Sequence, residues 1–122
     1  MTSPALDLAP LGGVWRKTNE GPQWIDHLVV RIDDGQAIVH VFGSASPSRP
    51  DWGESRAEIT YATAANPSTA SALLARYAFD ECDVDVEANV NLGLLVVATF
   101  VRWRGGQRSD AFTREFFYRS DV

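Results

Sequence analysis

The stretch DVDVEANVN, from Asp83 to Asn91, alternates between polar side chains and small or β-branched apolar ones. Successive side chains of a β-strand point to opposite faces, so its Val and Ala residues share one face and its Asp, Glu and Asn residues the other. A turn, Asn91-Leu92-Gly93, follows, and then a second apolar and β-branched run, Leu94–Arg104. Two such runs around a short Asn/Gly turn are typical of a β-hairpin. The stretch therefore predicts a β-sheet that buries one face.

Six further runs of the same kind lie on either side of this hairpin, and no segment shows a sustained helical period. Two longer breaks between runs, 44–52 and 64–70, are rich in Ser, Pro and small residues and are expected to be surface loops. The eight predicted strands are Gly13–Thr18, Trp24–Ile32, Ala37–Gly43, Ser55–Thr63, Ser71–Asp80, Asp83–Asn91, Leu94–Arg104 and Ala111–Arg119.

Eight strands with mostly short connections predict an all-β fold, an eight-stranded antiparallel up-and-down β-barrel. Closure into a barrel is favoured because an open sheet would leave two exposed edges. The interior of such a barrel holds either packed side chains or one small ligand. We expect a single domain over residues 12–122, preceded by a flexible N-terminal segment over residues 1–11.

Composition narrows the classes of function. The chain has 122 residues with 16 acidic and 11 basic side chains, and a net charge of −5 argues against a nucleic-acid partner. No apolar run approaches the ~18 residues of a membrane span, and the N-terminus lacks the pattern of a signal peptide, so a cytoplasmic protein is expected. A single cysteine excludes an internal disulfide. Lys17 is the only lysine, beside ten arginines.

Two motifs carry a resemblance to known families. Gly13-Val14-Trp15 at the start and Phe117-Tyr118-Arg119 at the end resemble the calycin signature, in which a tryptophan plugs the barrel and an arginine packs across it. The stretch 39–53, VHVFGSASPSRPDWG, is similar to V-H-x-[WF]-G-x-C-x-P-x-x-C-D-W-G of a family of small, uncharacterised bacterial lipocalin-like proteins. That family tends to end in R-x-D-[YF]-x-x-R-E-x-F-x-R, which is matched by Arg108, Asp110, Arg114, Glu115, Phe117 and Arg119. The resemblance covers residues 12–119 and implies a lipocalin-like barrel.

The chain departs from this family at two sites. The two cysteines of the family pattern fall on Ala45 and Pro50, and the asparagine that follows the Gly-x-Trp motif falls on Lys17. In avidins an asparagine at this offset lies inside the barrel near the ligand. The resemblance therefore implies a member adapted to a ligand or chemistry of its own, and the family supplies no firm activity.

Lys17 and Glu115 are the first candidates for chemistry. If Trp15 faces inward, Lys17 faces inward as well, and a register of Trp15 opposite Phe117 would place Lys17 opposite Glu115. Such a pair would serve as an acid and a base, or the lysine would bind a carbonyl group. The alternative is a structural salt bridge at the barrel mouth, or a different register with both groups in solvent. Asp26 and Tyr77 complete the candidate catalytic set.

Aromatic side chains are numerous for this length and suggest an apolar cavity with a few polar groups, although many of them would serve only as core packing. Trp52, after a long loop, is the candidate for a lid over the open end. The predicted ligand-binding residues are Trp24, Val41, Trp52, Tyr61, Phe79 and Phe117. His27 and His40 are expected on the outer face, with His40 free to hydrogen-bond Asp51 or Trp52. No motif points to a metal site or a cofactor.

Three functions remain open. The favoured one is binding of a hydrophobic small molecule, such as a secondary metabolite or its precursor, inside the barrel. The second is a cofactor-independent cyclase or isomerase of a polyketide or terpenoid pathway, which would use the same cavity. The third is an interaction unit whose outer aromatics form an interface, for example in a homodimer.

Overall fold

The computed structural model describes residues 5–21, 23–44, 50–106 and 108–120, and the regular secondary structure within them is β-strand apart from one 3-10 turn. The turn η1 covers Ala9–Leu11. The strands are β1 (Gly13–Lys17), β2 (Ile25–Asp33), β3 (Gln36–Gly43), β4 (Asp51–Arg56), β5 (Ile59–Ala62), β6 (Ala70–Ala78), β7 (Cys82–Asn91), β8 (Leu94–Trp103) and β9 (Ala111–Ser120). The prediction of an all-β chain is confirmed.

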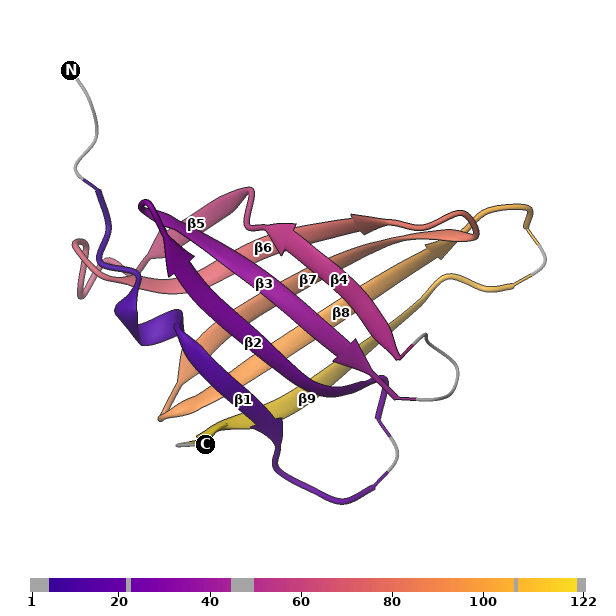
Figure 1. Cartoon of the computed structure of the whole chain (residues 1–122), viewed down its shortest axis with the longest axis horizontal. Helices are drawn as coiled ribbons and strands as arrows, with labels where there is room; N and C mark the ends of the chain where they lie inside the picture. The colour runs from indigo at the N-terminus through magenta and orange to yellow at the C-terminus, as the bar shows by residue number, and fades with distance from the viewer. Residues whose placement is uncertain (1–4, 22, 45–49, 107, 121–122) are drawn as a thin grey trace.

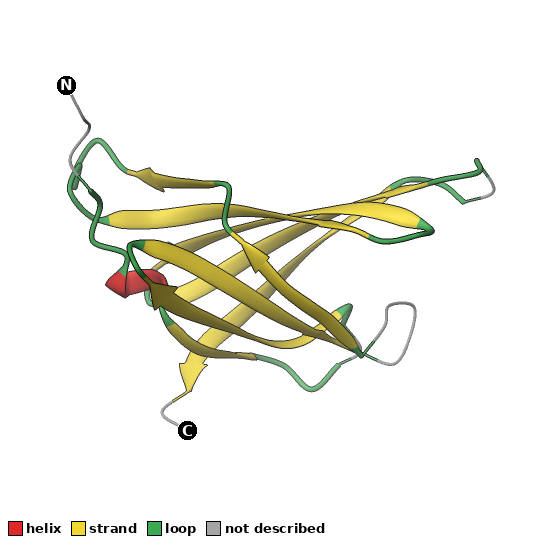
Figure 2. Ribbon diagram, turned by 45° about the horizontal axis from the view of Figure 1, so that its top comes forward, coloured by secondary structure: helices red, strands yellow, loops and turns green. Residues whose placement is uncertain are grey.

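All nine strands belong to one antiparallel sheet in the order β4-β3-β2-β1-β9-β8-β7-β6-β5. The first and last strands of the chain are therefore neighbours at the centre of the sheet. The sheet curls about this centre, so that β1 to β4 lie as one layer across β6 to β9 (Figures 1 and 2). The result is a curled half-barrel whose buried side chains lie between the two layers.

The strand count differs from the predicted eight because the expected strand Ser55–Thr63 is divided in two. The Ala57 N–H donates to the Ala37 carbonyl of β3 at 2.8 Å, whereas the Glu58 N–H donates to the Leu74 carbonyl of β6, also at 2.8 Å. The chain thus changes its pairing partner within one peptide unit. No ladder joins β4 to β5 in the described ranges, so these two strands are the edges of the curled sheet.

One end of the fold is filled by the N-terminal segment. Leu8 and Leu11 are buried, and the Trp15 indole N–H donates to the Leu11 carbonyl at 3.0 Å. The Arg119 guanidinium lies over the Trp15 ring, 4.8 Å from its centroid, which is the contact that the calycin resemblance implies. The described part of the segment expected to be flexible, residues 5–11, therefore contributes directly to the core.

The opposite end, which we call the open end, holds the C-terminal ends of β1, β3, β6 and β8 and the N-terminal ends of β2, β4, β7 and β9. The strand ends of the two layers spread apart here (Figures 1 and 2). Among the described residues there is no helix long and apolar enough to cross a membrane.

Candidate functional site

The register of β1 on β9 corrects the predicted pairing of Lys17 with Glu115. Trp15 lies opposite Arg119 and Lys17 opposite Phe117, so the register is two residues away from the one predicted. A shift of two residues keeps every side chain on its expected face, because the side-chain period of a strand is two. Lys17 and Glu115 therefore still belong to the same face of the sheet, but they are not ladder partners.

Glu115 is the buried acid of the interior. Its side chain is only 3% exposed, and its Oε2 atom accepts a hydrogen bond from the Ile25 N–H at 3.5 Å. Its Oε1 atom is buried and has no hydrogen-bond partner in the described part of the chain. Burial raises the pKa of Glu115, and the N–H groups of Ile25 and Trp24 and the charge of Lys17 oppose this only partly. The carboxyl group thus favours its protonated form more than an exposed glutamate does.

Lys17 acts electrostatically on this buried acid and contacts a second carboxylate at the rim of the open end. Its Nζ atom is 3.6 Å from Asp26 Oδ1, and Asp26 Oδ2 is 2.8 Å from His27 Nδ1. The hydrogen bond with His27, and to a lesser extent the charges of His27 and Lys17, lower the pKa of Asp26. Two carboxyl groups near one ammonium therefore have pKa values shifted in opposite directions, an arrangement typical of acid and base pairs.

A groove of about 660 Å³ adjoins this cluster, and Lys17, Asp26, His27 and Phe42 contribute to its walls. The candidates Lys17 and Asp26 are thus brought together, in contact with the groove. Glu115 does not line it.

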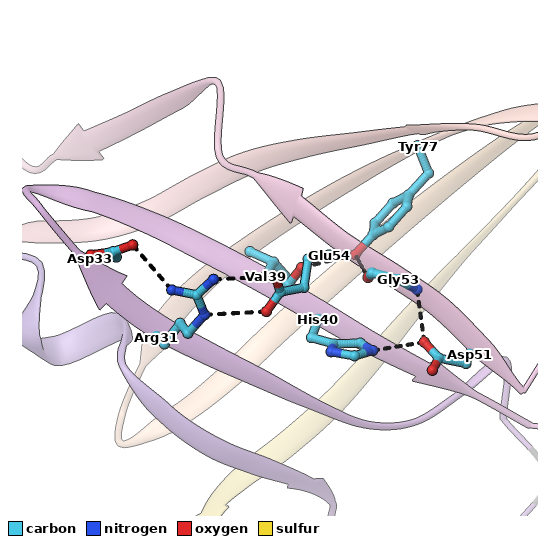
Figure 3. Close-up of polar contacts among 8 residues, drawn as sticks. All are labelled: Arg31, Asp33, Val39, His40, Asp51, Gly53, Glu54 and Tyr77. Carbon is cyan, nitrogen blue, oxygen red and sulfur yellow. Dashed lines mark hydrogen bonds and ion pairs between the residues drawn. The ribbon is translucent and has the colours of Figure 1, made fainter.

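Tyr77 stands apart from the other candidate catalytic residues. Its hydroxyl donates to the Gly53 carbonyl at 2.9 Å and lies 3.1 Å from the Val39 carbonyl, so β6 is tied to β3 and β4 (Figure 3). Burial raises the pKa of Tyr77 well above its usual range. The hydroxyl group is therefore engaged in joining the two layers and stays protonated.

The predicted lid residue, Trp52, is buried in the core. Its ring lies edge-on to Tyr77 and Phe79, with centroid distances of 5.7 and 6.1 Å. The rings of Tyr77 and Phe79 stack on each other at 5.7 Å. Trp52 is the second residue of β4 and is buried, so its side chain packs between the two layers instead of covering the open end.

The other predicted ligand-binding residues divide into three groups. Val41 and Phe117 are fully buried core residues. Trp24 and Phe79 are partly buried and pack against the core. Tyr61, on the edge strand β5, is 48% exposed and borders a separate hollow of about 220 Å³, so it does not join the interior site.

Two interior residues were not predicted. Trp103 is partly buried on the inner face of β8, and the Arg108 guanidinium lies over its ring at 4.3 Å. Thr99, on the same face, is fully buried, and its Oγ1 atom has no partner among the described residues. Val97 lies opposite Glu115 and Thr99 opposite Thr113, so Thr99 and Glu115 are diagonal neighbours. The alternation of β8 was the sequence signal that would have identified both.

The two histidines lie on the outer face, as predicted. Their rings stack on either side of Phe42, with centroid distances of 4.4 Å for His27 and 4.1 Å for His40. His40 Nε2 is 2.7 Å from Asp51 Oδ1, which also accepts the Gly53 N–H, and this lowers the pKa of Asp51 (Figure 3). No group of three or more His, Cys, Asp or Glu residues suited to a metal ion occurs in the part of the chain that the structure describes.

Comparisons with protein-family models, with curated proteins and with solved structures find no match to this chain. Of the two positions that replace the cysteines of the resembling family, Ala45 lies outside the described residues. The site must therefore be interpreted from its own geometry.

Proposed function

We propose that the chain binds a small, mainly apolar molecule at the open end of the curled sheet, with the polar group of that molecule directed toward Glu115. The observation that carries the proposal is the Oε1 atom of Glu115, which is buried and has no hydrogen-bond partner among the described residues. A buried polar atom without a partner costs about 1–3 kcal/mol, and a ligand that supplies the missing hydrogen bond recovers this energy.

Aromatic side chains that pack against the core near the strand ends support an apolar ligand. Trp24, Phe79 and Trp103 come from different strands or strand ends, and all three remain partly exposed while they pack against the core. Small-molecule sites commonly combine such aromatic walls with a few polar groups. Thr99 adds a second polar atom on the face that carries Glu115.

The cluster at the rim supports a polar group in the same ligand. Lys17 contacts Asp26 in the groove and also acts electrostatically on Glu115. A hydroxyl, amide or carbonyl group would find a donor in Lys17 or in protonated Glu115, and an acceptor in ionised Glu115.

We expect the neutral dye Nile red to bind the chain with a rise in its fluorescence, and Trp24→Ala to weaken this binding about tenfold. The reason is the loss of one aromatic contact, which is worth on the order of 1 kcal/mol beyond its area. The measurement is a fluorescence titration at fixed dye concentration.

Phe112→Ala is the control for this titration, because Phe112 is an aromatic residue of the outer face with 66% exposure. Its dye affinity should equal that of the unchanged chain. An affinity that falls in Phe112→Ala and persists in Trp24→Ala would place the dye on the outer face and overturn the proposal.

A second candidate, an isomerase, is supported by the opposed pKa shifts of Glu115 and Asp26 around Lys17. In its ionised form Glu115 would take a proton from the α-carbon of a β,γ-unsaturated ketone and return it to the γ-carbon, which leaves the conjugated isomer. Lys17 would stabilise the enolate oxygen.

We expect the chain to speed conversion of a β,γ-unsaturated cyclic ketone, followed by the absorbance of the conjugated product, and Glu115→Gln to reduce the rate about 10²-fold. Equal rates for the unchanged chain and for Glu115→Gln would exclude this activity for Glu115 and leave binding as the proposed function.

A further inference from the structure

An apolar patch covers the outer face of β8 and β9, away from the candidate site. Four of its aromatic side chains are exposed: Phe112 to 66%, Tyr118 to 46%, Phe116 to 41% and Phe100 to 37%. We call this set, together with Leu94 and Val96 of the same face, the outer patch. The two strands lie side by side in Figure 1.

The outer patch is ordered in rows across the two strands. Leu94 lies opposite Tyr118, Val96 opposite Phe116, and Phe100 opposite Phe112. The rings of Phe100 and Phe112 stack with centroids 5.8 Å apart. Soluble proteins rarely expose contiguous apolar surface of this kind unless it binds a partner.

One row in the middle of the outer patch carries charge instead of apolar surface. In this row Glu87 of β7 lies opposite Ala98 of β8, and Ala98 lies opposite Arg114 of β9. Both charged side chains are exposed, and neither forms an ion pair within the described ranges. The row thus presents an acid and a base on either side of a small residue.

We infer that two copies of the chain form a symmetric dimer through their outer patches. A two-fold axis parallel to the strands, between β8 and β9, places β8 of one copy over β9 of the other. Phe100 then faces Phe112 of the second copy. In the other two apolar rows, Leu94 faces Tyr118 and Val96 faces Phe116 of the second copy. Interfaces of two-fold dimers are self-complementary in this way.

The charged row fits the same arrangement. Arg114 of one copy lies over Ala98 of the other, where the small side chain leaves room for it. Neighbouring strands are about 4.8 Å apart, so the guanidinium reaches Glu87 of the second copy. Two such ion pairs form, one on each side of the axis. An axis across the strands that runs through the charged row would instead place Glu87 against Glu87 and Arg114 against Arg114, and like charges disfavour it.

Sedimentation velocity over a concentration series tests the dimer. We expect the unchanged chain to sediment as a dimer at tens of micromolar, and the single variants Arg114→Glu and Glu87→Arg each to raise the dimer dissociation constant about tenfold or more. The double variant, Arg114→Glu with Glu87→Arg, restores the opposite charges and should return the constant to within about threefold of the original.

Phe116→Asp should abolish the dimer, whereas the matched control Tyr61→Asp, at a similarly exposed position on edge strand β5, should leave it intact. Circular dichroism checks that each variant is folded, and the charge exchange still tests the proposal if Phe116→Asp does not fold. Three results would overturn the inference: a monomeric unchanged chain at 100 μM, a dimer lost in Tyr61→Asp but kept in Phe116→Asp, or a double variant no tighter than the singles.

Discussion

Replacing Trp15 with alanine is expected to lower the free energy of unfolding by about 3–5 kcal/mol, the range for removal of a large aromatic side chain from a core. Trp15 is 1% exposed and is among the largest fully buried side chains. Its indole N–H also holds η1 through the Leu11 carbonyl, and its ring lies under Arg119. The substitution therefore opens a cavity and releases the N-terminal turn at once.

The measurement is urea unfolding followed by far-ultraviolet circular dichroism. Most small domains are stable by only about 5–15 kcal/mol, so the Trp15→Ala chain should unfold at much lower urea concentration or be largely unfolded in buffer. Tyr61→Ala, at a half-exposed position on β5, is the control and should change stability by less than about 1 kcal/mol. A loss of stability for Trp15→Ala no larger than that of Tyr61→Ala would mean that Trp15 does not anchor this end of the fold.

Strand positions were the part of the fold that could be predicted from the sequence. The expected strands Asp83–Asn91 and Leu94–Arg104 agree with β7 and β8 to within one residue at each end. Alternation of polar and apolar side chains is a local property, so each strand carries the signal by itself. The partner of a strand is not local, and this is why the break at Ala57 and Glu58 was missed.

In the candidate site, too, local features could be predicted from the sequence and non-local contacts could not. The faces of Lys17 and Glu115 follow from alternation and were predicted, but a register shift of two residues leaves the alternation unchanged and cannot be detected from it. The Ile25 N–H group that donates to Glu115 comes from the first residue of β2, ninety positions away in the chain. The sequence identified the acid but not its surroundings.

Glu115 is expected to reduce the stability of the folded chain at neutral and alkaline pH, and Glu115→Gln to remove this loss. Burial raises the pKa of Glu115 in the folded state above its value in the unfolded chain. Gln keeps an oxygen that accepts the Ile25 N–H, and it carries no charge at any pH. The comparison therefore isolates the cost of the buried charge.

The sign follows from proton binding. Below the unfolded pKa both states hold the proton, and the two chains should be about equally stable. As the pH rises through the unfolded pKa, the unfolded chain ionises while the folded one keeps its proton, so the unchanged chain loses stability relative to Glu115→Gln. The difference in the free energy of unfolding between the two chains stops growing once the pH exceeds the pKa of Glu115 in the folded state. Lys17 is a charged group that acts on Glu115, and it is the same in the two chains.

Urea unfolding at a series of pH values from 4 to 9 measures this difference, which should reach about 1.4 kcal/mol for each unit by which burial raises the pKa of Glu115. Glu20→Gln, at an exposed position between β1 and β2, is the control and should give a difference that does not depend on pH in this way. A constant difference for Glu115→Gln would show that the carboxyl group is solvated in the folded chain. A different result is that the stability advantage of Glu115→Gln grows with pH and that the same variant no longer binds the ligand. This would mean that the chain keeps a destabilising acid because its ligand requires it. Binding sites often reduce stability in this way.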